Sequence, residues 1–102
     1  MSDITKARRA LAARVLDGAG TAARSERRAA FDNVGLPNPT STLTDKVVRH
    51  ANTVIDKDIV AVRTSGLSED QIFELVVCSA IGEATRQYDL AVAALDAASG
   101  KR

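Results

Sequence analysis

His50 is the only histidine of the sequence, and it follows Lys46 by four residues, a spacing that puts both side chains on one face of a helix. An imidazole can act as a general base near neutral pH, and a neighbouring ammonium group can hold an anionic substrate. These two residues are therefore the candidate catalytic pair. The structural alternative is that His50, near a helix end, bonds a carbonyl or a carboxylate.

Four further charged residues allow both a chemical and a structural interpretation. Asp56 and Asp58 could bind a cation, but carboxylates are also favourable at the start of a helix, where Asp56 is the expected N-cap. Glu83 and Arg86 could line a polar pocket, but a spacing of three residues favours an ion pair along one helix. We expect the structural role for both pairs, and the sequence predicts no metal site and no cofactor.

Cys78 is the only cysteine of the sequence. A single cysteine cannot form an intrachain disulfide or a Cys-x-x-Cys redox or zinc pair, which is consistent with a reducing compartment. Its neighbours Val76, Val77 and Ala80 indicate an inert buried thiol. No apolar run reaches the roughly 18 residues of a membrane span, and the N-terminus lacks the apolar core of a signal peptide. We expect a cytoplasmic protein.

The pattern of apolar residues predicts an all-α fold in one small domain. The composition is 45% hydrophobic but only 3% aromatic, which is typical of helices packed through Ala, Val, Leu and Ile. Gly35, Pro37 and Pro39 mark the main loop, which separates an N-terminal helical pair (1–34) from a helical core (42–98). The five helices are expected at residues 3–17, 22–32, 42–53, 57–65 and 69–98.

Two apolar stripes are expected to face the core. The first helix carries Ile4, Ala7, Leu11 and Val15; the last carries Phe73, Val77, Ala80, Ala84, Tyr88, Ala91 and Leu95. A helix of thirty residues would be about 45 Å long, whereas a domain of this size is roughly 35 Å across. The last helix must therefore break near Gly82 or pack its far end on another subunit. Its apolar character favours a homo-oligomer.

The basic residues are concentrated in the first 28 positions, although the net charge of the chain is only +1. Such a segment could bind nucleic acid, but it lacks aromatic residues for base stacking and is not followed by a recognition-helix pattern. Attraction to the acidic remainder, within the chain or between subunits, is the better explanation. The residues concerned are Lys6, Arg8, Arg9, Arg14, Arg24, Arg27 and Arg28.

The segment from Gly66 to Glu74 joins the last two helices and has the strongest local signals of the chain. Ser68 and Gln71 have the spacing of a capping box, and Leu67 and Ile72 that of its hydrophobic staple. Gly66 stands where the preceding helix needs a left-handed residue. These signals predict a helix end, a short turn and a new helix beginning at position 69.

This join, with the runs Lys46–Ala51 and Val54–Ile59, resembles the carboxymuconolactone decarboxylase and alkylhydroperoxidase D superfamily over about residues 42–95. The resemblance implies an alkylhydroperoxidase D-like bundle of about five helices and a homo-oligomer. Redox-active relatives carry Cys-x-x-Cys-x-x-x-His before the turn glycine. Here Ala51, Val54 and Asp58 stand at those positions, which implies a short branch without thiol redox chemistry.

Three functions are compatible with these observations. The favoured one is a non-catalytic structural or accessory subunit that assembles with itself and, as the resemblance allows, with a catalytic relative. The alternative is a cysteine-independent enzyme or small-molecule binder of lactone or acid type that uses His50 and Lys46. A nucleic-acid-binding regulatory protein has only the basic N-terminal segment in its favour, and neither nucleic acid nor a membrane is an expected partner.

Overall fold

The computed structural model of the protein describes residues 2–100, which form five α-helices and no β-strand. The all-α prediction is confirmed. Predicted and observed helix boundaries agree within two residues, except that the third helix ends at His50 and its expected last three residues form a 3-10 turn. The elements are α1 (Ser2–Asp17), α2 (Arg24–Asp32), α3 (Thr40–His50), η1 (Ala51–Thr53), α4 (Asp56–Thr64) and α5 (Glu69–Ala98).

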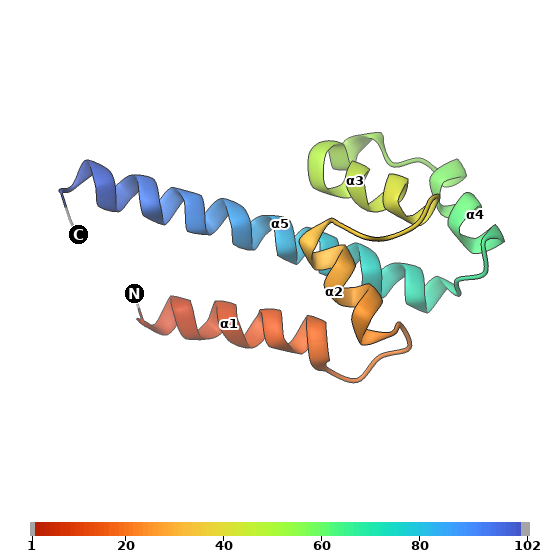
Figure 1. The fold of residues 1–102 in the computed structure, drawn as a ribbon, viewed down its shortest axis with the longest axis horizontal. Helices are drawn as coiled ribbons and strands as arrows, with labels where there is room; N and C mark the ends of the chain where they lie inside the picture. The colour runs from red at the N-terminus through yellow and green to blue at the C-terminus, as the bar shows by residue number, and fades with distance from the viewer. Residues whose placement is uncertain (1, 101–102) are drawn as a thin grey trace.

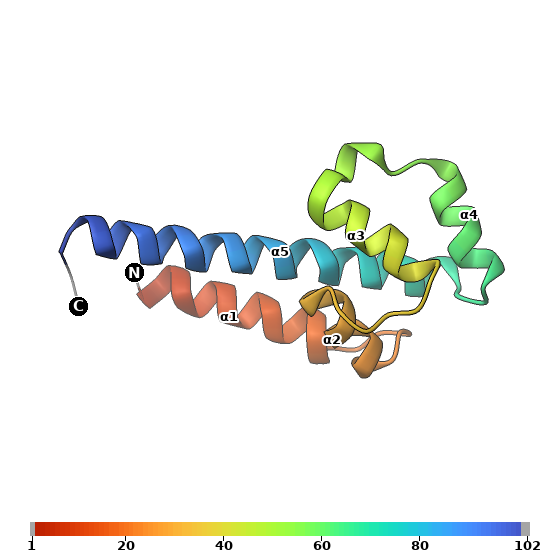
Figure 2. The same cartoon turned by 45° about the horizontal axis from the view of Figure 1, so that its top comes forward.

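All the other helices pack on α5 (Figures 1 and 2). Helix α1 runs antiparallel beside it, α2 crosses its middle, and α3 and α4 cover its first half from another side. The outer parts of α1 and α5 project together beyond α2 and α3, so the molecule measures 51 × 28 × 20 Å. Within residues 2–100, none of the helices combines the length and the apolarity needed to cross a bilayer.

The core consists of two small clusters on different sides of α5. The first lies between α1, α2 and α5 and contains Leu16, Ala22, Ala30, Phe31, Leu75 and Cys78. The second lies between α3, α4 and α5 and contains Leu43, Val62 and Ile72. Because both clusters are near the first half of α5, the outer half has almost no core of its own.

Gly82 allows α2 to approach α5 closely. A Cβ atom at this position would overlap the carbonyl group and the Cα atom of Phe31 at the end of α2. A residue without a side chain is therefore required where the two backbones meet. The helix does not break there: α5 is continuous over its 30 residues, and its outer part projects as a result.

The buried face of α5 is not the predicted one. Its buried residues are Ile72, Leu75, Cys78, Ser79 and Gly82. In the expected stripe, by contrast, Phe73 is 69% and Leu95 68% exposed; Ala80, Ala84 and Ala91 are exposed as well, and only Val77 and Tyr88 are partly buried. The prediction of this core face was therefore wrong for the single chain. The first half of α5 is apolar on nearly all sides, so periodicity alone did not identify the side that the other helices cover.

The same correction applies to α1. Ile4 and Leu11 of the predicted stripe are 50% and 45% exposed, and only Val15 is partly covered. The helix is rotated so that Ala12 and Leu16 contribute to the core instead. Leaving large apolar side chains in water forgoes the favourable free energy of burial, about 1.5–3 kcal/mol for each fully buried Leu or Ile.

The join between α4 and α5 has the predicted geometry. Gly66 adopts a φ of +120° after the end of α4. The Ser68 hydroxyl accepts from the Gln71 N–H at 3.1 Å, and the Gln71 side chain accepts from the Ser68 N–H at 2.8 Å. Leu67 packs against the cluster that contains Ile72. The capping box and the left-handed glycine are therefore confirmed.

Candidate functional site

The structure places His50 and Lys46 in different surroundings. The Lys46 ammonium group forms an ion pair with Asp58 of α4, with Nζ at 2.9 and 3.0 Å from the two carboxylate oxygens. His50 is the last residue of α3; it is exposed and lines a hollow to which Lys46 does not contribute. The suggested catalytic role of this pair stays a prediction, and any anion at Lys46 would have to compete with Asp58.

Asp58, and not Asp56, caps α4. An Asp58 oxygen accepts a hydrogen bond from the Ile55 N–H at 2.9 Å, while Asp56 is the exposed first residue of the helix. The Ile55 N–H and the ammonium group of Lys46 hold the pKa of Asp58 below its usual range. Asp58 therefore joins α3 to the start of α4. Within residues 2–100, no group of three or more His, Cys, Asp or Glu side chains could hold a metal ion.

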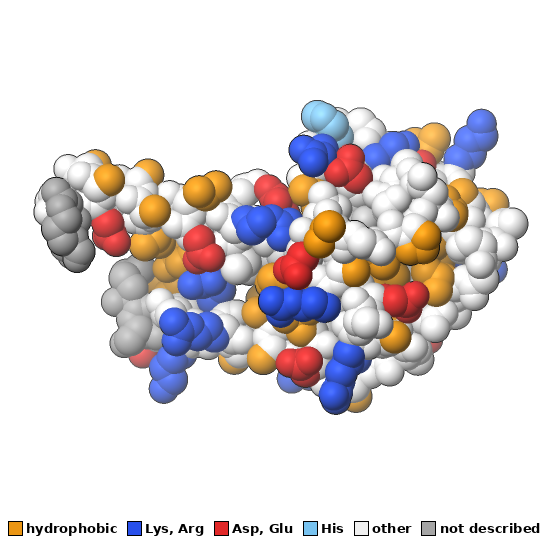
Figure 3. Space-filling view, in the orientation of Figure 1, with side chains coloured by type: hydrophobic (Ala, Val, Ile, Leu, Met, Phe, Trp, Pro, Cys, Tyr) orange, Lys and Arg blue, Asp and Glu red, His pale blue; other side chains and the backbone are white. Residues whose placement is uncertain are grey.

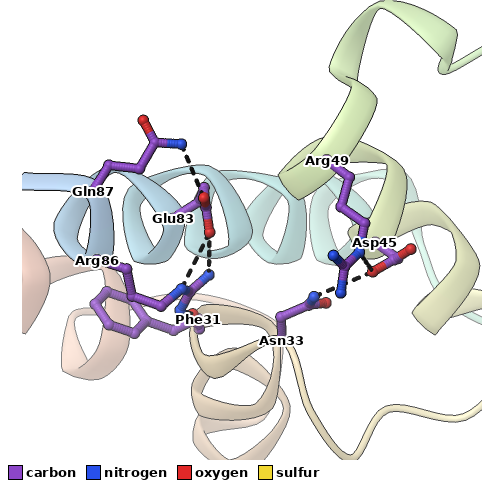
Figure 4. A network of polar contacts seen from close by, with 7 residues as sticks. All are labelled: Phe31, Asn33, Asp45, Arg49, Glu83, Arg86 and Gln87. Carbon is purple, nitrogen blue, oxygen red and sulfur yellow. Dashed lines mark hydrogen bonds and ion pairs between the residues drawn. The ribbon is translucent and has the colours of Figure 1, made fainter. Parts of the chain in front are cut away.

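The hollow beside His50 is open, has a volume of about 640 Å³, and lies where the end of α2 meets α3 and α5. Polar and charged side chains dominate its lining, and Figure 4 shows how most of them are connected. They come from three elements that are separated in the sequence, so no local motif indicated this arrangement. The lining residues are Asp32, Asn33, Val48, Arg49, His50, Glu83, Arg86 and Gln87.

On the α3 side of the hollow, the Asp45 carboxylate accepts two hydrogen bonds (Figure 4). Arg49 Nε donates at 2.7 Å and Asn33 Nδ2 at 3.3 Å. The bond from Arg49 is the main cause that lowers the pKa of Asp45, and Asn33 adds to it. The Asn33 bond connects the end of α2 to α3.

On the α5 side, Glu83 accepts from Arg86 at 3.0 and 3.2 Å and from Gln87 at 2.9 Å. These bonds, led by the one from Gln87, lower the pKa of Glu83. Arg86 also donates to the carbonyl oxygen of Phe31 at 2.6 Å, which ties α5 to the last turn of α2 (Figure 4). The predicted Glu83–Arg86 ion pair is confirmed.

The chemistry of this hollow is limited by its internal pairing. Arg49 and Arg86 could each donate to a carboxylate ligand, but both already bind a protein carboxylate. His50 is the one imidazole at the rim and can accept or donate a proton. An acid ligand at the two guanidinium groups would have to compete with Asp45 and Glu83.

No sequence pattern indicated the contact between Glu74 and the loop before α2. The Glu74 carboxylate accepts from the backbone N–H groups of Thr21, at 2.9 and 3.0 Å, and of Ala22, at 2.8 Å. These bonds hold the pKa of Glu74 below its usual range, the Thr21 N–H being the main cause. A side chain of α5 thus fixes the chain direction into α2, and this role is structural.

Cys78 is buried, as predicted. Its side chain is 1% exposed, and its sulfur donates a hydrogen bond to the carbonyl oxygen of Val15 at 3.2 Å. Burial raises the pKa of the thiol, although the charge of the nearby Arg27 opposes this effect. The neutral thiol is a poor nucleophile, so the surroundings do not activate Cys78.

The projecting parts of α1 and α5 have a second kind of surface. Large apolar side chains are exposed along both helices (Figure 3), among them Ile4 and Leu11 on α1 and Leu90, Val92 and Leu95 on α5. Between the helices, Arg8 lies 3.3 Å from Asp89 and stacks its guanidinium group 4.6 Å from the ring centre of Tyr88. This ion pair joins the basic N-terminal segment to the acidic part of the chain.

Comparison of the chain with family models, with curated proteins and with solved structures finds no match. The superfamily resemblance of residues 42–95 therefore rests on the sequence motifs alone. Two features of the fold remain as functional candidates, the polar hollow beside His50 and the exposed apolar side chains of α1 and α5.

Proposed function

We propose that this protein is a structural or accessory helical subunit that works by assembling with further copies of itself. The carrying observation is the projecting α1–α5 pair, whose outer part exposes Ile4 by 50% and Leu95 by 68%. Single exposed apolar residues are common on proteins. Here they recur along two neighbouring helices that extend beyond the core, and two helices side by side cannot enclose them.

The proposal includes a relationship to the alkylhydroperoxidase D-like superfamily without its thiol chemistry. Ala51 and Val54 stand at the positions of the redox cysteines and Asp58 at that of the histidine. Asp58 caps α4 and binds Lys46, so this position supports the fold. Cys78 is buried on the inner side of α5 and cannot replace the missing pair. An accessory role fits a chain that keeps the helical scaffold and has lost the reacting groups.

Light scattering coupled to size-exclusion chromatography tests the proposed self-assembly. We expect a mass that is a multiple of the 10.8 kDa chain at micromolar concentration. The apolar contacts should persist in high salt, because burial of apolar surface is not screened by ions. A monomer across this concentration range would overturn the proposal.

The polar hollow beside His50 supports a second candidate, a binder or enzyme for small acids or lactones. The observation in its favour is that His50, Arg49 and Arg86 line the same hollow, which has a volume of about 640 Å³. Small carboxylates and lactones should then raise the melting temperature with increasing occupancy. His50→Gln should abolish this shift. Lys46→Met should leave it unchanged if the ligand lies in this hollow, and should abolish it if Lys46 forms the anion site.

A further inference from the structure

We infer that two copies of the chain meet through one defined surface, which we call the α1–α5 face, and that their paired helices form a two-fold symmetric four-helix bundle. This inference rests on the proposed self-assembly and names the surface that performs it. The α1–α5 face consists of Ile4, Ala7, Leu11 and Val15 of α1 and of Phe73, Val77, Ala80, Ala84, Tyr88, Ala91 and Leu95 of α5.

The two halves of the face lie on the same side of the helix pair. A small groove of about 110 Å³ runs between α1 and α5, and its lining includes Arg14 and Val15 from α1 and Phe73 and Val77 from α5. Val15 and Val77 are thus neighbours across the groove. Residues three, four or seven positions away lie on the same side of a helix, so both stripes continue from this groove toward the projecting end.

The face is apolar along its full length. None of its eleven side chains carries a charge, and Phe73, Ile4 and Leu11 are exposed by 69%, 50% and 45%. The nearest charges flank the face: Arg14 lines the groove beside Val15, and Arg8, which is paired with Asp89, stacks on the ring of Tyr88. A second copy presents the same uncharged surface and so complements this one.

The area reaches the lower limit for a specific dimer. The α5 part of the face extends for about 33 Å from Phe73 to Leu95, and the α1 part for about 17 Å from Ile4 to Val15. At about 10 Å of width per helix, each copy can bury about 500 Å², or about 1,000 Å² in total, which is the lower limit for a specific interface.

The arrangement of the helices favours a bundle. Each copy supplies two antiparallel helices, and two such pairs stacked face to face have the composition of a four-helix bundle. A two-fold axis makes the surface meet itself, as in most homodimers. The small side chains of Ala80, Ala84 and Ala91 allow the partner helix to come close, while Phe73 and Leu95 at the two ends provide the large apolar contacts.

A pair of matched substitutions in the full-length chain tests the inference. Ala84 and Ala93 are both exposed residues of α5, and nine positions correspond to half a revolution around the helix. Ala84→Glu introduces a charge into the α1–α5 face, whereas Ala93→Glu introduces the same charge on the opposite side. We expect Ala84→Glu to reduce the mass measured by light scattering, with unchanged helical circular dichroism, and Ala93→Glu to keep the wild-type mass.

Ala7→Glu, with Ala13→Glu as its control, repeats the test on α1. If Ala84→Glu fails to fold, the mass of Ala7→Glu shows whether the α1–α5 face is the interface. If the wild type is an oligomer and neither Ala84→Glu nor Ala7→Glu changes its mass, the α1–α5 face is not the interface, whereas the proposed self-assembly still holds. Loss of assembly in the control variants as well would also overturn the face. A monomeric wild type would overturn both proposals.

Discussion

The Oε2 atom of Glu74 lies 2.9 Å from both the backbone nitrogen and the hydroxyl oxygen of Thr21, 53 positions earlier in the chain. One carboxylate on α5 thereby satisfies the donors of the loop that leads into α2. Helix α2 in turn supplies Phe31 to the core and lines the polar hollow with Asp32. The contact therefore supports both the packing and the candidate site.

Replacing Glu74 by Gln should lower the free energy of unfolding by about 1 kcal/mol at neutral pH, because hydrogen bonds to a charged, partly exposed acceptor are lost. The pKa of Glu74 is lowered from 4.5 in the folded protein. Its contribution is therefore complete above that value and is lost as the pH falls through the folded-state pKa. Urea unfolding at several pH values should show the difference between wild type and variant shrinking in acid.

Thr21→Val is the matched comparison for Glu74→Gln. It removes the hydroxyl donor but keeps the backbone N–H bonds to Glu74, so it should cost less than Glu74→Gln. Equal stability of wild type and Glu74→Gln at pH 7 would contradict the proposed role of this carboxylate.

Gly82→Ala should destabilise the fold by about 1–3 kcal/mol, because the added methyl group would overlap the backbone of Phe31 and force α2 away from α5. Helix propensity alone predicts the opposite sign, a gain of about 1 kcal/mol. The sign of the change in thermal or urea unfolding therefore decides between close packing and propensity. A more stable variant would mean that α2 does not approach α5 at this position.

Lys46→Met should move the pKa of Asp58 upward, since it removes an ammonium group at 2.9 Å. The pKa should still remain below that of an ordinary aspartate, because the hydrogen bond from the Ile55 N–H is the larger cause. Titration of the carboxyl carbon by nuclear magnetic resonance measures both effects. Lys57→Met, an exposed lysine on the same helix as Asp58, serves as the control. An unchanged pKa in Lys46→Met would show that this ion pair is absent in solution.

Cys78 should react slowly with an aromatic disulfide reagent in the native protein and rapidly after denaturation. It is 1% exposed, and burial raises its pKa, so little reactive thiolate is accessible. In Ala93→Cys, the added exposed thiol should react quickly while Cys78 remains slow. Rapid labelling of wild-type Cys78 would show that the inner side of α5 opens in solution.

The sequence determined where the helices are, because their boundaries depend on neighbouring residues. The capping box of Ser68 and Gln71 and the left-handed Gly66 are contained in a few positions, so their geometry could be predicted without the rest of the molecule. The ion pair between Glu83 and Arg86 has the same local origin.

The sequence did not determine which side of α5 is buried, because helical periodicity shows which residues share a side and not which side is covered. Phe73 and Ile72 are equally apolar, yet Phe73 is exposed and Ile72 buried. The choice depends on contacts between helices, namely the cover of Ile72 by Leu43 of α3 and Val62 of α4 and the close approach of α2 at Gly82, and such contacts leave no periodic signal.

The composition of the candidate sites likewise depends on contacts between segments that are distant in the sequence. His50 and Lys46 share a helix spacing, but Asp58 on α4 binds Lys46, and residues from α2 and α5 surround His50. Glu74 and Thr21 meet only because α5 lies beside the loop before α2. Local interactions therefore determined the helices of this protein, while contacts between distant segments decided which side chains are buried, paired or free to bind a partner.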